Sequence, residues 1–270
     1  MVIPGGDAPP AVPVLVYHNI DPRIEFSITR VSPTQFGRQM DFLAENGYRT
    51  ATLAEVAEAR RQRTLLPEKT VAIVFDDALE GVYDHALPVL VERSFVCTIL
   101  PIVEYIGRLN TWDANIGWVR RPHMDWRQLA EASVSGMEIG SHTLRHPDLT
   151  ALHDDMLCYE LERSRFVLED RIGCAVRALS CPFGRCSSRV VDRAFAAGYT
   201  VVSVIRGKTV FAHSSGGYVL PGTGVYGTTS RRSFMRKVAG MVAPFWLRWI
   251  ETGIGFCAGQ TPRIKPPDTP

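Results

Sequence analysis

The sequence has few features of nucleic-acid-binding or membrane-spanning proteins. Its formal net charge is only +2 over 270 residues, and no run of Lys and Arg forms a stripe that could follow a phosphate backbone. Its apolar runs are far shorter than the roughly 20 residues that a transmembrane helix needs. We therefore expect neither a nucleic-acid partner nor a membrane-spanning helix.

Signals for secretion and for disulfide bonding are also missing. Residues 1–11 are rich in Pro and Gly but have no basic start and no apolar stretch, so no signal peptide is visible and we expect a flexible N-terminus. The six cysteines form no CxxC pair and are expected to be reduced thiols, with Cys181 and Cys186, which flank a motif described below, as candidates for an exception. A cytoplasmic location is the corresponding expectation.

Apolar, β-branched runs alternate with segments of helical period. This alternation predicts parallel strands joined by right-handed crossovers, and a series of six or seven units favours a (β/α) barrel over an open sheet. We expect one catalytic domain over residues 12–260, followed by a disordered Pro-rich tail at 261–270. The expected strands are Val12–Tyr17, Val71–Phe75, Phe95–Leu100, Met137–Ser141, Ala178–Cys181 and Thr200–Val204.

Helix starts are marked by residues that cap free backbone N–H groups. Ser32 with Gln35 and Thr52 with Glu55 form capping boxes, and Pro33 fits the first helical position. Further N-caps are expected at Asp125 and at Ser187 or Ser188, ahead of helices over Trp126–Ala132 and Val190–Ala197.

Two adjacent carboxylates, Asp76 and Asp77, follow one expected strand. Catalytic residues of such barrels gather at the C-terminal ends of strands. Successive side chains of an extended chain point in opposite directions, so one carboxylate can bind a metal while the other accepts a proton. A helix-capping pair with Asp77 at the N-cap is the alternative.

Two histidines follow another expected strand. If the segment is helical, the spacing of four places His142 and His146 on one face, as metal ligands require. No carboxylate lies between them as in zinc proteases, so a general base must come from elsewhere, and Asp76 can supply it. A chance pair on the surface is the alternative.

A sharp turn follows a third strand. Pro182, Phe183, Gly184 and Arg185 come directly after it, and this turn could present backbone N–H groups to an oxyanion. An ordinary strand-to-helix turn is the alternative.

These three motifs, in this order and spacing, resemble the polysaccharide deacetylase (NodB-like) family, also called carbohydrate esterase family 4. The resemblance runs from about Val12 to Gly207 and is similar in pattern to the branch with poly-N-acetylglucosamine deacetylases. It implies a distorted (β/α)7 barrel that removes acetyl groups from N-acetylated hexosamines. It also implies that Asp77, His142 and His146 bind a divalent metal, commonly zinc, and that Asp76 is the catalytic base.

Several positions depart from the family pattern. Ala78 stands where the family commonly has Gly, and Ser180 stands where it often has Arg, so Arg185 or Arg177 would have to supply a charge beside Asp76. The family's C-terminal Leu-x-His motif is missing. The general acid is then expected to be His18, which ends the first strand and matches the resembled branch, with His213 as the alternative.

The sequence gives weaker evidence for the residues that contact the substrate or a membrane than for the metal ligands. Trp112 and Trp118 could stack on sugar faces or plug the barrel rim, whereas Trp126 and the histidines His85, His123 and His153 are expected to be packing or surface residues. Segment 230–256 mixes basic and aromatic residues, as in an interfacial helix beside a lipid-linked glycan or in a helix that closes the barrel.

The sequence therefore predicts a hydrolase acting on carbon–nitrogen bonds other than peptide bonds. Its expected reaction is removal of N-acetyl groups from N-acetylglucosamine units of an exopolysaccharide or a lipid-linked glycan. An O-acetyl esterase of the same fold and a carbohydrate-binding member with weak or lost turnover are the alternatives. Retention of Asp76 beside the metal ligands argues against a pure binder.

Overall fold

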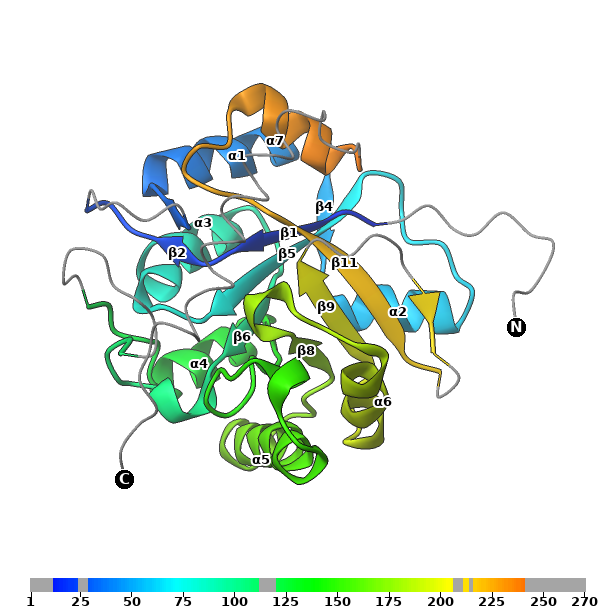
Figure 1. The fold of residues 1–270 in the computed structure, drawn as a ribbon. Helices are drawn as coiled ribbons and strands as arrows, with labels where there is room; N and C mark the ends of the chain where they lie inside the picture. The colour runs from blue at the N-terminus through cyan, green and yellow to red at the C-terminus, as the bar shows by residue number, and fades with distance from the viewer. Residues whose placement is uncertain (1–11, 24–28, 112–119, 206–210, 214–215, 241–270) are drawn as a thin grey trace.

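The computed structural model describes residues 12–23, 29–111, 120–205, 211–213 and 216–240. Seven parallel strands form a sheet in the order β7-β6-β5-β1-β11-β9-β8, with helices around its outside (Figure 1). These strands are β1 (Val14–Tyr17), β5 (Thr70–Asp77), β6 (Thr98–Pro101), β7 (Glu138–Ile139), β8 (Ala178–Ser180), β9 (Val201–Ile205) and β11 (Tyr218–Gly224).

The sheet curls into a nearly closed barrel. Its two outermost strands, β7 and β8, approach each other through a parallel bridge between Ser141 and Leu179. The expected (β/α)7 barrel is therefore present. It is distorted where β7 meets β8, because a single bridge joins these strands in place of a continuous ladder of hydrogen bonds.

Short strands extend this framework. β4 (Arg49–Ala51) pairs with the start of β5, and β10 (Phe211–Ala212) forms an antiparallel pair with β11. β2 (Asn19–Ile20) and β3 (Arg30–Val31) form a separate two-stranded sheet.

The main helices follow the predicted caps. Thr52 and Asp125 head capping boxes at α2 (Leu53–Arg61) and α4 (Trp126–Val134), and Ser187 caps α6 (Ser188–Ala196). Ser32 caps α1 (Pro33–Glu45), but the predicted capping box is incomplete, because the Gln35 side chain donates to the Thr229 carbonyl instead. The helices are α1 (Pro33–Glu45), α2 (Leu53–Arg61), α3 (Leu87–Glu92), α4 (Trp126–Val134), α5 (Asp154–Ile172), α6 (Ser188–Ala196) and α7 (Arg231–Val238), with shorter helical turns at Val82–Ala86, Val103–Tyr105, Leu149–Ala151 and Pro182–Gly184.

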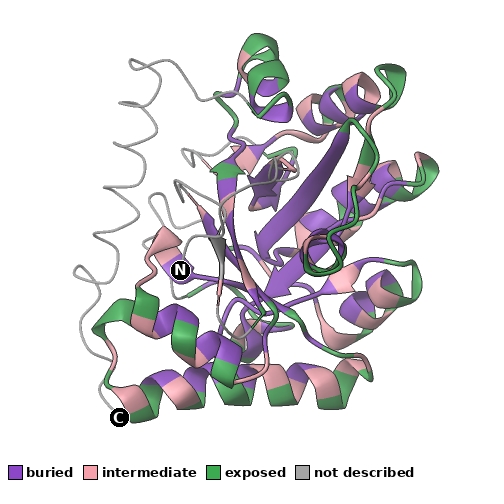
Figure 2. Ribbon diagram, turned by 90° about the vertical axis from the view of Figure 1, so that its right-hand side faces the viewer, coloured by how far each residue is buried: buried purple, intermediate pink, exposed green. Residues whose placement is uncertain are grey.

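Burial follows this layering. The strands are buried on both faces, whereas the helices expose their outer sides (Figure 2). One group of buried side chains fills the barrel, including Val14, Val74 and Leu220, and α2 covers it with Leu53 and Val56. A second group lies between the strands and the outer helices.

The C-terminal part of the described chain packs onto helix α1 at the outside of the barrel (Figure 1). Phe234 of α7 is 1% exposed, and its ring packs edge-on against Phe42 of α1, 6.0 Å between centroids. The start of segment 230–256 is therefore a covering helix, and residues 241–256 lie outside the described residues. Among the described helices, none is both long enough and apolar enough to cross a membrane.

Candidate metal centre and active site

The three predicted motifs meet at the C-terminal ends of the strands β5, β7 and β8. Asp76 and Asp77 are the last residues of β5, while His142 and His146 lie in the turn that follows β7. Pro182–Gly184 forms a tight helical turn directly after β8. Since parallel strands end at the same rim of the barrel, these distant segments of sequence form one site.

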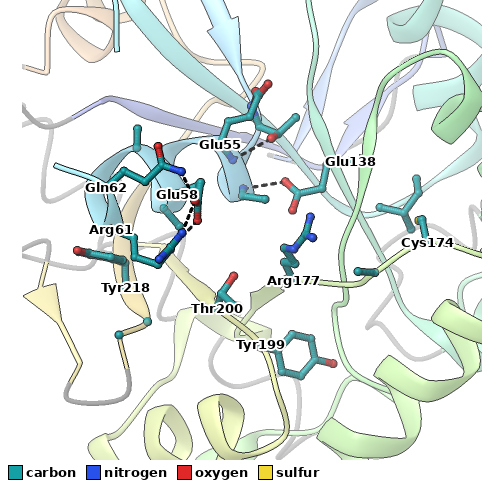
Figure 3. Close-up of a pocket in the computed structure, with 18 of the residues that line it drawn as sticks. Glu55, Glu58, Arg61, Gln62, Glu138, Cys174, Arg177, Tyr199, Thr200 and Tyr218 are labelled. Atoms are coloured by element: carbon teal, nitrogen blue, oxygen red, sulfur yellow. Dashed lines mark hydrogen bonds and ion pairs between the residues drawn. The ribbon is translucent and has the colours of Figure 1, made fainter. Parts of the chain in front are cut away.

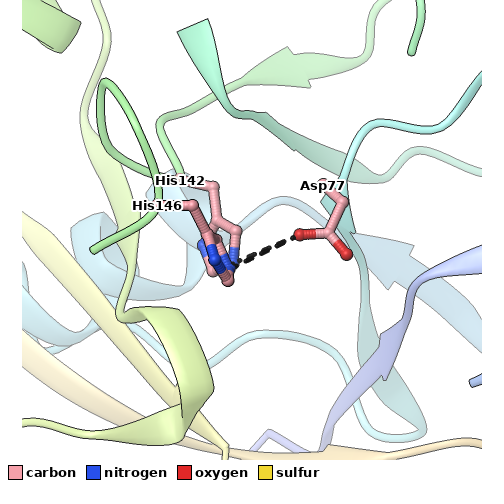
Figure 4. Close-up of side chains that lie close together, drawn as sticks. All are labelled: Asp77, His142 and His146. Atoms are coloured by element: carbon pink, nitrogen blue, oxygen red, sulfur yellow. Dashed lines mark hydrogen bonds and ion pairs between the residues drawn. The ribbon is translucent and has the colours of Figure 1, made fainter. Parts of the chain in front are cut away.

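Asp77, His142 and His146 form a compact set of possible ligands (Figure 4). Oδ1 of Asp77 lies 3.5 Å from Nε2 of His142 and 3.8 Å from Nε2 of His146. The two Nε2 atoms are 3.1 Å apart. All three side chains are buried, and one ligand atom from each lies within 4.8 Å of the others.

This geometry fits a divalent metal. Zinc–nitrogen and zinc–oxygen bonds of about 2.1 Å place two tetrahedral ligands about 3.4 Å apart, close to the spacings of this set. Burial lowers the pKa of His142 to about 4, against the opposing effect of a backbone hydrogen bond. Burial and then the charge of His142 lower the pKa of His146 well below its usual value. Both shifts favour the neutral imidazole that metal ligation requires.

The orientation of His142 is set by a backbone carbonyl. Its Nδ1 lies 3.0 Å from the carbonyl oxygen of Ser180, so Nδ1 carries the proton and donates it. Nε2 then keeps its lone pair and faces Asp77. A hydrogen bond from the remote ring nitrogen is the usual way in which proteins orient a ligating histidine.

The segment that carries both histidines is a turn, so the two imidazoles come together without the helix that was considered as the condition for the spacing of four. Thr143 and His146 have left-handed backbone angles, with φ of 71° and 62°. The Thr143 N–H donates to Oγ of Ser141, and the His146 N–H donates to Oγ1 of Thr143. These side-chain hydrogen bonds replace helical ones and turn both imidazoles toward Asp77.

Glu160 of α5 holds the outer part of this turn. Its carboxylate, 1% exposed, accepts hydrogen bonds from the backbone N–H groups of Leu144 and Arg145 and from Nε of Arg145. One buried carboxylate thus fixes the loop between the two histidines. Sequence reasoning did not identify this role, because the two segments lie 15 to 16 residues apart with no local pattern to link them.

Asp76 lies outside the set of possible metal ligands and is hydrogen-bonded instead to a residue of β8. Its Oδ2 accepts a hydrogen bond of 3.1 Å from the Ser180 hydroxyl, and the residue is 1% exposed. Burial raises the pKa of Asp76 to about 6, while the charge of His18 and the Ser180 hydrogen bond act in the opposite direction. A carboxylate with such a pKa is suited to accept a proton near neutral pH.

His18 directly follows β1 and lies beside this carboxylate. Burial lowers its pKa, the charge of Asp76 raises it, and His142 lowers it further. Its buried Nδ1 has no hydrogen-bond partner among the described residues. The charge interactions with Asp76 and His142 put the imidazole within electrostatic reach of both the candidate base and the metal ligands.

The turn after β8 places an aromatic ring against the site. Phe183 has a left-handed backbone (φ 58°), and its ring contacts His146 edge-on, with centroids 4.6 Å apart. Within the turn, the N–H groups of Gly184 and Arg185 donate to the carbonyls of Cys181 and Pro182. The backbone N–H of Phe183 is therefore the candidate for contact with substrate oxygen.

Neither arginine considered for Asp76 is paired with it. Arg185 forms an ion pair with Asp148, which joins the turn after β8 to the segment that follows His146. Arg177 precedes β8 and lines a hollow of about 1130 Å³ with Glu58 and Glu138 (Figure 3). That hollow lies at the N-terminal ends of the strands. The neutral hydroxyl of Ser180 thus takes the place expected for a guanidinium.

The remaining candidates fall into two groups. His213 lies near the start of β11, where its Nε2 is 2.7 Å from Oδ1 of Asp192 and its ring packs on Phe195. It is therefore at the opposite end of the barrel from Asp76. Trp112 and Trp118 lie outside the described residues.

His123, expected to be a surface or packing residue, is part of the site's support. It is 2% exposed, and its Nδ1 lies 2.7 Å from the carbonyl oxygen of Asp77. Burial lowers its pKa to about 4. No sequence pattern links His123 to Asp77, because the residues are 46 positions apart.

Known proteins resemble this chain in sequence and fold. YxkH of Bacillus subtilis is 28% identical over 193 residues, which cover 72% of this chain and 64% of YxkH. The poly-β-1,6-N-acetyl-D-glucosamine N-deacetylase of Escherichia coli is 28% identical over 132 residues, 47% of this chain and 20% of that enzyme. This chain thus spans less than two thirds of either relative.

The fold matches that of the deacetylase PplD from Streptococcus pyogenes, whose structure holds acetate. Its TM-score is 0.72 at 22% identity, over 85% of this chain and 99% of that one. The polysaccharide deacetylase family matches residues 64–202, which include Asp76, both histidines and the turn after β8. The chain belongs to the polysaccharide deacetylase family.

Proposed function

We propose that this protein is a metal-dependent hydrolase that removes N-acetyl groups from N-acetylglucosamine units of a glycan, as in exopolysaccharide modification. The observation that carries the proposal is the buried Asp76 carboxylate beside, but outside, the set Asp77, His142 and His146. A pure binding protein has no use for a free carboxylate with a raised pKa next to metal ligands. The E. coli relative, an N-deacetylase of poly-β-1,6-N-acetyl-D-glucosamine, supports the choice of substrate class.

The three proposed ligands would hold one divalent metal, most simply zinc, given two neutral imidazoles and one carboxylate. When bound, such a metal polarises the acetyl carbonyl and makes water a stronger nucleophile near neutral pH. The hydrogen bond from His142 to the Ser180 carbonyl fixes the ring for this purpose.

The protein's own groups account for the proton transfers. Asp76 accepts the proton of the attacking water, and Ser180 orients the carboxylate. The Phe183 N–H donates to the acetyl oxygen as negative charge develops on it. His18 takes up the proton that Asp76 has accepted and donates a proton to the nitrogen of the sugar, so that the carbon–nitrogen bond breaks to give a free amine and acetate.

The test is product analysis on a substrate panel. Metal-loaded protein is incubated with N-acetylglucosamine oligomers and with O-acetylated oligosaccharides of matched length, and both acetate and free amine are measured. Release of acetate and amine in equal amounts from the N-acetyl series is expected. Acetate from the O-acetyl series alone would identify an esterase, and no acetate from either series would favour a binding role.

A further inference from the structure

The backbone that carries the proposed metal ligand Asp77 has an unfavourable conformation. Asp77 and the next residue, Ala78, both have left-handed angles, with φ of 67° and 51°. Asp visits this region with some tolerance, but for Ala the Cβ atom crowds the backbone there. The Ala78 methyl is buried, so this conformation is enclosed by the core. Something in the fold must stabilise it.

A neighbouring segment supports this backbone from outside the sheet. The Ala78 carbonyl accepts a hydrogen bond of 2.8 Å from the Met124 N–H, and the Glu80 N–H donates to the Pro122 carbonyl at 2.9 Å. Between them, Leu79 and His123 form an antiparallel bridge.

The side chain of His123 adds the contact closest to the ligand. Its Nδ1 lies 2.7 Å from the Asp77 carbonyl oxygen, and since a carbonyl only accepts, Nδ1 must carry the proton. The His123 ring is buried against the Tyr105 ring, with centroids 5.7 Å apart. The backbone N–H of His123 donates to the Arg108 carbonyl. The imidazole is thus fixed on both sides and holds the peptide between Asp77 and Ala78.

We propose that His123 is a positioning residue that holds the left-handed Asp77–Ala78 backbone and thereby aims the Asp77 carboxylate at His142 and His146. This inference rests on the proposed metal centre. A glycine after the paired aspartates would adopt positive φ without a steric penalty. This chain has Ala78 instead, and the buried hydrogen bond from His123 compensates for the methyl group.

The test measures metal affinity of the full chain, with Zn²⁺ in competition with a chromophoric chelator. His123→Ala is expected to weaken zinc binding by about 10- to 100-fold, the usual effect of losing a group that orients a ligand. His123→Asn, whose amide can donate from the place of Nδ1, is expected to stay within about threefold of wild type. His123→Gln, whose amide lies one bond further out, is expected to behave like His123→Ala.

A second substitution separates this role from general packing. Ala78→Gly removes the steric penalty, so in the His123→Ala background it is expected to recover about tenfold or more of the lost affinity, while alone it changes affinity by about threefold or less. His153→Ala serves as a matched control, because His153 is exposed and its side chain makes no capping hydrogen bond at the start of α5.

The outcomes separate the two proposals. A wild-type chain that takes up no divalent metal overturns the proposed function. If the wild-type chain takes up metal and both His123→Ala and His123→Gln bind zinc with unchanged affinity, only the role of His123 is overturned. Lost affinity that Ala78→Gly does not recover also overturns it, since His123 would then act through other contacts. If His123→Ala does not fold, the comparison of His123→Asn with His123→Gln decides.

Discussion

The hydroxyl of Ser180 lies 3.1 Å from Oδ2 of Asp76, where the family pattern often has an arginine. The partner of the proposed base is thus a neutral donor. A guanidinium would hold the pKa of the carboxyl low, whereas burial raises the pKa of Asp76 to about 6 against the effects of His18 and Ser180. The site therefore keeps a stronger base than an ion pair would allow.

Replacing Ser180 is the first prediction. Ser180→Ala removes one neutral hydrogen bond to Asp76, worth about 0.5–1.5 kcal/mol, so kcat should fall by roughly 2- to 10-fold with metal content unchanged. Ser203→Ala is the control. Ser203 is the register partner of Ser180 on β9, is equally buried, and its hydroxyl has no hydrogen-bond partner among the described residues. A loss in Ser203→Ala as large as in Ser180→Ala would point to packing.

Metal removal should lower stability as well as activity. A ligand present at 100 times its Kd stabilises a fold by about 2.7 kcal/mol, which for a domain of this size corresponds to a shift in Tm of roughly 5–10 °C. Scanning calorimetry before and after treatment with a chelator measures the shift. His142→Ala should contain no metal and should melt at the same temperature with or without the chelator. A chelator-sensitive Tm in that variant would contradict the ligand assignment.

Asp76→Asn should separate binding from chemistry. The amide has nearly the same size but cannot accept the proton of water, so acetate release should fall by about 10²- to 10⁴-fold. Because Asp76 is not among the three proposed ligands, the metal content by elemental analysis should stay at the wild-type value. Turnover close to wild type would assign the base to another group.

Much of this architecture could be predicted from sequence. Apolar runs that end in Asp76, in His142 and in Pro182 identified three strand ends, and the caps at Ser32, Thr52 and Asp125 identified three helix starts. These signals are local. They come from side-chain alternation and from backbone groups that need a partner within three residues.

Features that depend on distant contacts were missed. The strand Tyr218–Gly224 was not predicted, because Pro221 and its neighbouring glycines indicate a turn by local rules, yet β11 lies between β1 and β9. A Cβ atom at Gly222 would lie 2.8 Å from Cγ2 of Val16, which explains a small residue there. The hold of Glu160 on the loop between His142 and His146 and the support from His123 likewise depend on partners from other segments.

Acid stability should depend on a buried ion pair away from the metal ligands. Asp21 and Arg121 are both buried, with Oδ2 and a guanidinium nitrogen 2.9 Å apart. Burial alone raises the pKa of Asp21, but hydrogen bonds from Arg23 and the charge of Arg121 outweigh it and lower that pKa below its usual 3.8. The folded state then binds fewer protons than the unfolded state, so this contribution is complete above about pH 4 and is lost as the pH falls through the folded-state pKa.

Asp21→Asn should therefore lower the free energy of unfolding by about 1.5–3 kcal/mol at neutral pH, the usual value of a charged hydrogen bond. The difference from wild type should shrink as the pH falls below about 4, in urea titrations at several pH values. Asp41→Asn is the control, since the Asp41–Arg93 pair is half exposed and surface pairs contribute about 0.2–1 kcal/mol. A difference for Asp21→Asn that is independent of pH would contradict the ion-pair explanation.

The last prediction concerns the proton donor to the leaving group. His18 lies beside Asp76 and His142, whereas His213, the alternative in the sequence, is bonded to Asp192 at the opposite end of the barrel. An amine anion is a very poor leaving group, so amide cleavage needs a donated proton, while an activated ester leaves without one. His18→Ala should therefore reduce kcat on N-acetyl oligosaccharides by about 10²-fold or more, with a much smaller effect on an activated acetate ester.

Two control measurements test whether His18 acts as the proton donor. Metal content in His18→Ala should match wild type, because the imidazole is not among the three proposed ligands. His213→Ala should leave both activities unchanged, since its contacts are with Asp192 and Phe195. Equal losses of amide and ester cleavage in His18→Ala would mean that His18 orients Asp76 or the substrate, and no loss on either would leave the amine to take its proton from water.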